Sequence, residues 1–286
     1  MKPHLSKTKL EMLGRCGVQY EWRYVKGVKK PPAAAMIIGT GMHSAVEADL
    51  RNKLEWGSLL EEDDVKTVAA DSVRTRWSET PPDIRSDEPN IGGAIDEAVA
   101  LASLHHRELA PLIAPVSVES ARRIELDGFP YDIELRSDVE EKERIRDLKT
   151  SAKAPSDADM QSLTLQGQIE TLEAKLRGEP KPFVRDVFVK GRNRRIMTTP
   201  EIHATPDDHQ EVLLRVEAAV RVLESGAFTP TTPDSWLCSA RWCGYYAECA
   251  HGARHAVSVG LIDPARLASR ASTMEKRYSS GVGQGE

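Results

Sequence analysis

The chain has 286 residues, of which 40% are hydrophobic and 29% charged, and its formal net charge is −5. This composition is typical of a folded globular protein and argues against disorder along the whole chain. The acidic balance argues against a surface that is basic all over, although it leaves room for a local nucleic-acid groove.

The hydrophobic pattern predicts an α/β organisation without internal repeats. A short helix is expected at 8–13, with Thr8 and Glu11 in capping-box spacing and Gly14 at its end. A second helix is expected at 41–54. Region 60–112 has a mostly helical pattern that a polar, Pro-rich loop at 78–90 interrupts. Strands are then predicted at 116–126, 129–139 and 143–150, followed by a helix at 159–177, a strand at 183–190 and a helix at 207–225.

The ends of the chain carry no membrane signal. The N-terminus lacks the apolar core of a signal peptide, and the longest apolar run, near "AAAMII", is too short to cross a bilayer. We therefore expect a cytoplasmic protein without membrane contact. The polar tail at 263–286 is expected to be disordered.

The stretch "RDLKTS" follows an acidic run and predicts a β-hairpin with "EKER" as its turn. In that register Glu140 pairs with Ile145, and Asp138 lies opposite Asp147 on the face that also carries Lys149. Opposed carboxylates destabilise a sheet unless a cation lies between them, and Mg²⁺ prefers carboxylate oxygens. The pattern indicates a metal site, with a solvated acidic hairpin as the alternative.

These motifs, in this order, resemble the PD-(D/E)xK nuclease superfamily, and within it the RecB-like branch with its CRISPR-associated and phage-encoded single-stranded DNA exonucleases. The likeness rests on "IGTGMHSAVEADL", the hairpin and "SLTLQGQIETLEAKL", and it covers roughly residues 5–250. It implies a restriction-endonuclease-like α/β core, in which helices flank a central mixed β-sheet. One nuclease domain would span 1–262, with a helical insertion at about 55–112.

The resemblance also implies a site for one or two Mg²⁺ or Mn²⁺ ions. Such an ion lowers the pKa of a bound water and clamps the scissile phosphate. The implied metal ligands are His43, Asp138, Asp147 and the backbone carbonyl of Leu148, and the implied catalytic side chains are Asp138, Asp147, Lys149 and Gln168.

Two of these assignments depend on the family context. His43 follows Gly39 and Thr40 in "GTGMH", which matches the family's metal-binding segment, whereas a lone His near a helix start is more commonly a cap or a half-buried side chain. Glu47, one turn later, is expected to accept a hydrogen bond from the other ring nitrogen. Gln168 matches the family's glutamine on the helix after the Asp-x-Lys strand. Gln166 is its competitor, and the family's usual Tyr four residues after the glutamine corresponds to Leu172 if Gln168 holds that role.

The cysteines form a second signal. Disulfides are rare in the expected compartment, so the clustered spacing in "WLCSARWCGYYAEC" indicates a metal or a cluster. RecB-like nucleases with a 4Fe-4S cluster use one N-terminal and three C-terminal cysteines, and the resemblance implies such a C-terminal lobe from about 5–30 and 228–255. Zinc or four unrelated cysteines are the alternatives. The ligands would be Cys16, Cys238, Cys243 and Cys249.

The predicted function is a metal-dependent DNA nuclease, an exonuclease on single-stranded ends in recombination, repair or phage DNA processing. Tyr245 and Tyr246 are expected either to stack on bases or to pack inside the cluster lobe. A silent DNA-binding subunit and a structural zinc protein are the rival functions. No helicase motif occurs, so a helicase or recombination partner would supply any unwinding. Phosphate contacts are expected from a basic loop, with a solvated hairpin tip as its alternative: Lys190, Arg192, Arg194 and Arg195.

Overall fold

The computed structural model describes residues 2–82, 88–232, 234–258 and 260. The expected tail at 263–286 and part of the loop at 78–90 lie outside the described residues. The chain divides into two compact units. The first contains the residues up to Lys7 and Pro31–Glu217, and the second contains Thr8–Lys30 and the chain from Ala218 onward.

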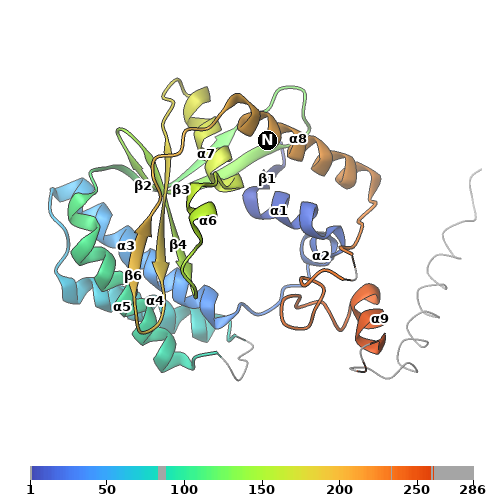
Figure 1. Cartoon of the computed structure of the whole chain (residues 1–286), viewed down its shortest axis with the longest axis horizontal. Coiled ribbons are helices and arrows are strands. Elements are labelled where there is room, and N and C mark those ends of the chain that lie inside the picture. The colour runs from blue at the N-terminus through green and yellow to red at the C-terminus, as the bar shows by residue number, and fades with distance from the viewer. Residues whose placement is uncertain (1, 83–87, 233, 259, 261–286) are drawn as a thin grey trace, which may run out of the picture. The chain divides into compact units, whose positions relative to one another are not determined.

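A mixed sheet forms the centre of the first unit (Figure 1). Strand β3 pairs antiparallel with β2 and β4 and parallel with β1, while β5 runs parallel to β4 and antiparallel to β6. Such a mixture needs helical crossovers as well as hairpins. The strands are β1 (His4–Ser6), β2 (Pro115–Ile124), β3 (Asp132–Glu141), β4 (Ile145–Ser151), β5 (Phe183–Val189) and β6 (Arg195–Thr198).

Helices cover the sheet on both faces (Figure 1). On one face α3 buries Met42 and Val46 against Val139 and Leu148. On the other face lies α7, whose Ala174 shares a buried cluster with strand residues. The helices of this unit are α3 (Ala34–Trp56), α4 (Glu62–Glu79), α5 (Ile91–Glu108), the 3₁₀ turn η2 (Ala110–Leu112), α6 (Asp157–Gln161), α7 (Leu165–Leu176) and α8 (Pro206–Ser225), the last of which continues into the second unit.

Gly41 lets α3, α4 and α5 approach one another closely. A Cβ at this position would lie 2.5 Å from Val73 Cγ2, 3.1 Å from the Ala69 carbonyl oxygen and 3.2 Å from Ala98 Cβ. Because the backbone of α4 and the side chains around it are buried, they have little room to move. The "IGTG" segment is thus a helix–helix contact inside α3, whereas the sequence pattern predicted that the helix begins after it.

The predicted strands and most predicted helices are present, and the differences have local causes. The helix expected at 159–177 is two helices, because the Thr164 side chain accepts a hydrogen bond from Gly167 N and caps a new helix there. Helix α1 (Lys7–Arg15) continues past Gly14, which costs a helix only about 1 kcal/mol. The short strands β1 and β6 carry too few residues for a periodic signal and were not predicted.

The second unit is built from short helices and turns. Its helices are α1, α2 (Gly17–Tyr20), the π-helical turn η1 (Glu21–Val25), the end of α8 and α9 (Ala250–Ser258). Tyr245 Oη donates a hydrogen bond to the Val28 carbonyl over 2.6 Å, and Lys30 contacts Glu248. These contacts join the N-terminal segment to the C-terminal segment. Within the described chain, no helix is both long enough and apolar enough to cross a membrane.

Candidate active site

The hairpin of β3 and β4 opens just beyond its turn. Glu140 pairs with Ile145, as the sequence predicts, and Val139 pairs with Arg146. The ladder ends there, one position before Asp138 and Asp147 would face each other. The Asp138 carboxylate instead accepts a hydrogen bond from the Leu148 backbone N–H over 2.7 Å. The two strands therefore separate, and the Asp138 carboxylate lies in the fork.

Asp147 and Lys149 lie on the same face of β4. Asp147 is fully buried, and its Oδ1 accepts a hydrogen bond from Lys149 Nζ over 2.5 Å. Its Oδ2 is buried and has no hydrogen-bond partner among the residues that the structure describes. Burial lowers the pKa of Lys149, but the carboxylates of Asp147 and Asp138 outweigh this, so that its pKa is raised. The ammonium group therefore stays charged at the edge of the site.

His43 reaches the Asp138 carboxylate from α3. Its Nδ1 lies 3.8 Å from Asp138 Oδ1 and 3.8 Å from Glu119 Oε1. One ligand atom from each of these three residues falls within 4.8 Å of the others. Imidazole nitrogen and carboxylate oxygens are suitable donors for Mg²⁺ or Mn²⁺. Glu47, which the sequence predicted as the partner of His43, instead pairs with Arg51.

Glu119 is a member of this group that the sequence analysis missed. It lies in β2 with a φ of +49°, the left-handed region that non-glycine residues rarely adopt. Its neighbours Val118 and Ser120 pair with Val139 and Ser137, so Glu119 stands across from Asp138 in the ladder. Strained backbone of this kind commonly occurs at functional sites. The only local signal in the sequence was an acidic residue within a strand.

The site is electrostatically strained in the absence of a cation. Burial raises the pKa of Asp138 to about 6, where the positive His43 opposes the shift and the nearby Asp147 adds to it. Burial lowers the pKa of His43, but the nearby carboxylates of Glu119 and Asp138 raise it overall. Carboxylates held together in this way gain stability when a divalent cation binds.

The structure does not bring Gln168 to this group. Its Nε2 donates hydrogen bonds to Asp208 Oδ1 over 3.3 Å and to Glu211 Oε2 over 3.0 Å, both on α8. Gln166 instead donates to Glu170 Oε1 over 2.5 Å, and burial, followed by the charge of Asp147, raises the pKa of Glu170. The contacts therefore favour Gln166 over Gln168 as the glutamine that belongs to the candidate active site. Glu170, four residues after Gln166, then occupies the position where the resemblance expects a Tyr.

The basic loop between β5 and β6 is partly engaged by α5. Arg194 Nη2 contacts Glu97 Oε2 over 2.6 Å, and the Gly191 backbone N–H donates to Glu97 Oε1. Arg192 and Arg195 are exposed. Lys190 is half-buried, and burial lowers its pKa. Glu97 thus holds Arg194 and the loop backbone, while Arg192 and Arg195 point a positive charge toward solvent.

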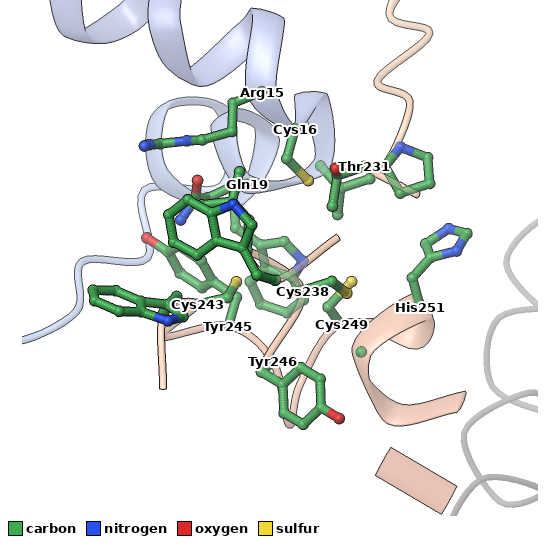
Figure 2. Close-up of a pocket in the computed structure, with 17 residues that line it drawn as sticks. Arg15, Cys16, Gln19, Thr231, Cys238, Cys243, Tyr245, Tyr246, Cys249 and His251 are labelled. Carbon is green, nitrogen blue, oxygen red and sulfur yellow. The ribbon is translucent and has the colours of Figure 1, made fainter. Parts of the chain in front are cut away.

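The four cysteines line one pocket of the second unit (Figure 2). All four are free, and the cavity has a volume of about 290 Å³. Burial raises the pKa of Cys243, and Cys16, Cys249 and Cys238 raise it further. Four thiolates could share this space only with positive charge between them. The donor set suits iron–sulfur or zinc.

The burial of Tyr245 and Tyr246 decides between base stacking and packing inside the unit. Tyr245 and Tyr246 are only 4% and 5% exposed, so both pack inside the unit. Tyr245 stacks on Trp22 with ring centroids 5.9 Å apart, and the Tyr246 hydroxyl hydrogen-bonds with His255 Nδ1. Neither ring is available to a nucleic-acid base. The exposed aromatic side chains beside this pocket are those of Trp236 and Trp242, which meet edge to face at 5.3 Å.

The fold and the Asp-x-Lys site define a class of nucleases. The model of the PD-(D/E)XK nuclease superfamily matches residues 4–250, and the chain belongs to this superfamily. The restriction-endonuclease-like core expected from the sequence is consistent with the mixed sheet and its flanking helices.

One solved structure supports the fold. A candidate exonuclease from Eubacterium rectale has 16% sequence identity and a TM-score of 0.53, over 82% of this chain and 86% of that chain. The protein SSO0001 has 17% identity and a TM-score of 0.33, over 85% of this chain and 93% of that chain. No curated protein matches the sequence.

Proposed function

We propose that this chain is a Mg²⁺- or Mn²⁺-dependent deoxyribonuclease that removes nucleotides from single-stranded DNA ends in recombination, repair or phage DNA processing. The observation that carries the proposal is the convergence of His43, Glu119 and Asp138 beside the buried Asp147 and its partner Lys149. A helicase or recombination protein would be its partner where DNA must be unwound.

The metal would be held by residues of β2, β3, β4 and α3. A bound divalent ion supplies a water of lowered pKa and positive charge at the scissile phosphate. Lys149 orients the attacking water and places an ammonium charge near the phosphate. Asp147 holds Lys149 in position over 2.5 Å. The proposed ligands are His43, Glu119, Asp138, Asp147 and the backbone carbonyl of Leu148.

An exposed tryptophan pair supports the preference for single strands. Trp236 is 65% exposed and Trp242 54% exposed, and the Arg241 guanidinium lies 5.5 Å from the centre of the Trp242 ring. Stacking on aromatic side chains is available to unpaired bases and contributes about 1 to 3 kcal/mol per base. Segment 8–30 of the same unit carries six Lys or Arg residues against two Glu, which attracts a phosphate backbone.

The second unit is proposed to hold a 4Fe-4S cluster on Cys16, Cys238, Cys243 and Cys249. The proposal is supported by the four cysteines lining one pocket, because four thiolates are the usual ligands of such a cluster. A zinc ion on the same four cysteines is the alternative. Iron and acid-labile sulfide analysis of anaerobically purified protein tests this proposal. Four iron and four sulfide per chain are expected, and zinc without sulfide would replace the cluster with a zinc site.

Digestion of DNA tests the nuclease function directly. End-labelled and circular substrates, each single- and double-stranded, are incubated with the protein and Mg²⁺, Mn²⁺ or EDTA. We expect metal-dependent release of nucleotides from linear single strands and no cleavage of circles. Binding of the same DNA without any degradation would favour the silent DNA-binding subunit.

A further inference from the structure

Arg136 lies at the edge of the candidate active site, and the proposed mechanism does not use it. It precedes Asp138 by two residues on β3, so both side chains point to the same face of the sheet. Its Nε lies 2.7 Å from Glu119 Oε2, whereas Glu119 Oε1 lies 3.8 Å from His43 Nδ1. The Glu119 carboxylate thus contacts the guanidinium with one oxygen and faces the imidazole with the other.

Stability alone does not account for this arginine. The Arg136 side chain is 61% exposed, and ion pairs at the surface commonly contribute only about 0 to 1 kcal/mol to folding. A guanidinium carries five N–H donors in a rigid fork, and the contact with Glu119 occupies one of them. Among the residues that the structure describes, the Arg136 side chain has no second partner. Its remaining donors are therefore free to bind a ligand that approaches from solvent.

The charge of the site favours an anionic ligand at this position. Carboxylates at Glu119, Asp138 and Asp147 repel an incoming DNA backbone unless cations stand beside them. Arg136 is placed on Glu119 as Lys149 is placed on Asp147, with a partly exposed cation on one oxygen of a site carboxylate. An arginine fork binds phosphate through two parallel N–H bonds, whereas a lysine acts as a point charge.

We propose that Arg136 binds a backbone phosphate that flanks the scissile phosphate and thereby sets the position of the DNA strand over the metal ligands. The inference rests on the proposed nuclease function. In that function the scissile phosphate belongs to the metal ion and Lys149. Because the Glu119 carboxylate lies between the guanidinium and His43, Arg136 stands outside the metal ligands. A neighbouring phosphate of the same strand is therefore the group that it meets.

Cleavage of DNA that carries one neutral methylphosphonate linkage tests the proposal. Single strands are made with this linkage at each position flanking the one that is cut first, and kcat/KM with Mg²⁺ is measured for each substrate. Arg136→Gln should lower kcat/KM on unmodified DNA by about 10-fold or more, because a hydrogen bond between charged groups is lost. One flanking methylphosphonate should cost the wild type a similar factor and should cost Arg136→Gln little more.

Arg74→Gln is the matched control, because Arg74 is also exposed and contacts Asp71 over 2.6 Å on α4. It should cleave every substrate as the wild type does. If the losses from Arg136→Gln and from the methylphosphonate multiply at every flanking linkage, Arg136 only holds Glu119 and the proposal is wrong. A wild type that cleaves no DNA overturns the proposed function as well.

Arg136→Lys provides a second variant, which also serves if Arg136→Gln does not fold. It keeps the charge but loses the fork, so it should retain part of the activity on unmodified DNA. The flanking methylphosphonate should cost this variant less than it costs the wild type. An equal cost in both proteins would contradict the contact between Arg136 and that phosphate.

Discussion

At the residue scale, burial and charge act together on a few carboxylates. Asp147 is fully buried, and one of its oxygens accepts a hydrogen bond from Lys149, while the other finds no partner in the described part of the chain. Such a group costs free energy in the metal-free protein, because its desolvation is only partly compensated. Function explains its presence better than stability does.

Asp147→Ala and Lys149→Ala should therefore separate activity from folding. We expect each variant to lose hydrolysis of single-stranded DNA by about 10³-fold or more, since transition-state charge loses its stabilisation. The melting temperature of metal-free Asp147→Ala should be equal to or above that of the wild type. Wild-type rates with Mn²⁺ in either variant would show that the catalytic assignment is wrong.

A second buried carboxylate, Glu140, should make stability depend on pH. Burial would raise its pKa, but hydrogen bonds from Lys181, Arg122 and Arg177 outweigh this and lower its pKa to about 2. Because the folded pKa lies below the unfolded one, the stabilisation is present above about pH 4.5 and is lost as the pH falls toward 2. The shift corresponds to on the order of 3 kcal/mol.

Urea denaturation of Glu140→Gln measures this contribution. The variant should be less stable than the wild type at neutral pH, and the difference should shrink as the pH falls from 4.5 toward 2. Glu179→Gln is a suitable control, because its carboxylate is 57% exposed and should change stability little. A difference that does not vary with pH would contradict the role of the Glu140 charge.

At the element scale, the position of α3 decides where His43 lies. The helix packs its apolar side on the sheet, and Gly41 permits the contact with α4 and α5. His43 follows two residues later on the same helix. A shift of α3 would therefore move the imidazole away from Asp138 and Glu119.

Gly41→Ala should lower the free energy of unfolding by about 1 to 3 kcal/mol, because the added methyl overpacks a buried contact. Chemical denaturation measures the change. Gly92→Ala on α5 is the matched control: its Cβ would meet only Asn90 Oδ1 at 3.4 Å, and Ala favours a helix over Gly. Equal effects of the two substitutions would show that the helices around Gly41 can move apart to accept a methyl group.

The loop between β5 and β6 offers a test of DNA contact. Replacing Arg192 and Arg195 with Gln should weaken single-stranded DNA binding and reduce the salt slope by about 0.7 for each phosphate that the loop no longer neutralises. Arg194→Gln should change the slope less, because that guanidinium is already bound by Glu97. Fluorescence anisotropy across a salt series measures both. An unchanged slope in the double variant would make the loop a solvated hairpin tip.

At the scale of the whole molecule, the second unit depends on residues far apart in the sequence. Cys16 and Cys238 line the same pocket although most of the chain separates them. Joint ligation of a cluster would act as a cross-link, and a loop of this length removes about 5 kcal/mol of unfolded-chain entropy. This is comparable to the net stability of a domain.

Cys16→Ala should therefore bleach the brown colour expected of a cluster, lower the melting temperature and impair DNA processing. On anaerobic samples, visible absorbance follows the colour of the cluster. Calorimetry follows the melting temperature, and digestion assays follow DNA processing. Ser239→Ala serves as the control, because Ser239 directly follows Cys238 and carries no sulfur atom that could bind the cluster. A colourless wild type would remove the basis of this prediction.

The sequence by itself determined the strand hairpin and its first register pair, the Asp147-x-Lys149 pair, the cysteine set and most helix positions. These features depend on local turn chemistry and on periods of two or 3.6 residues, which are visible in short windows. Only the tertiary structure decided that Glu119 joins His43, that Gln166 rather than Gln168 faces Glu170, and that Glu97 holds Arg194. The contacts of Glu119 with His43 and of Glu97 with Arg194 join distant segments, and their geometry depends on how packed elements cross, which no local pattern contains. Gln166 and Glu170 lie one turn apart on α7, but which of its faces turns inward depends on how the helix packs.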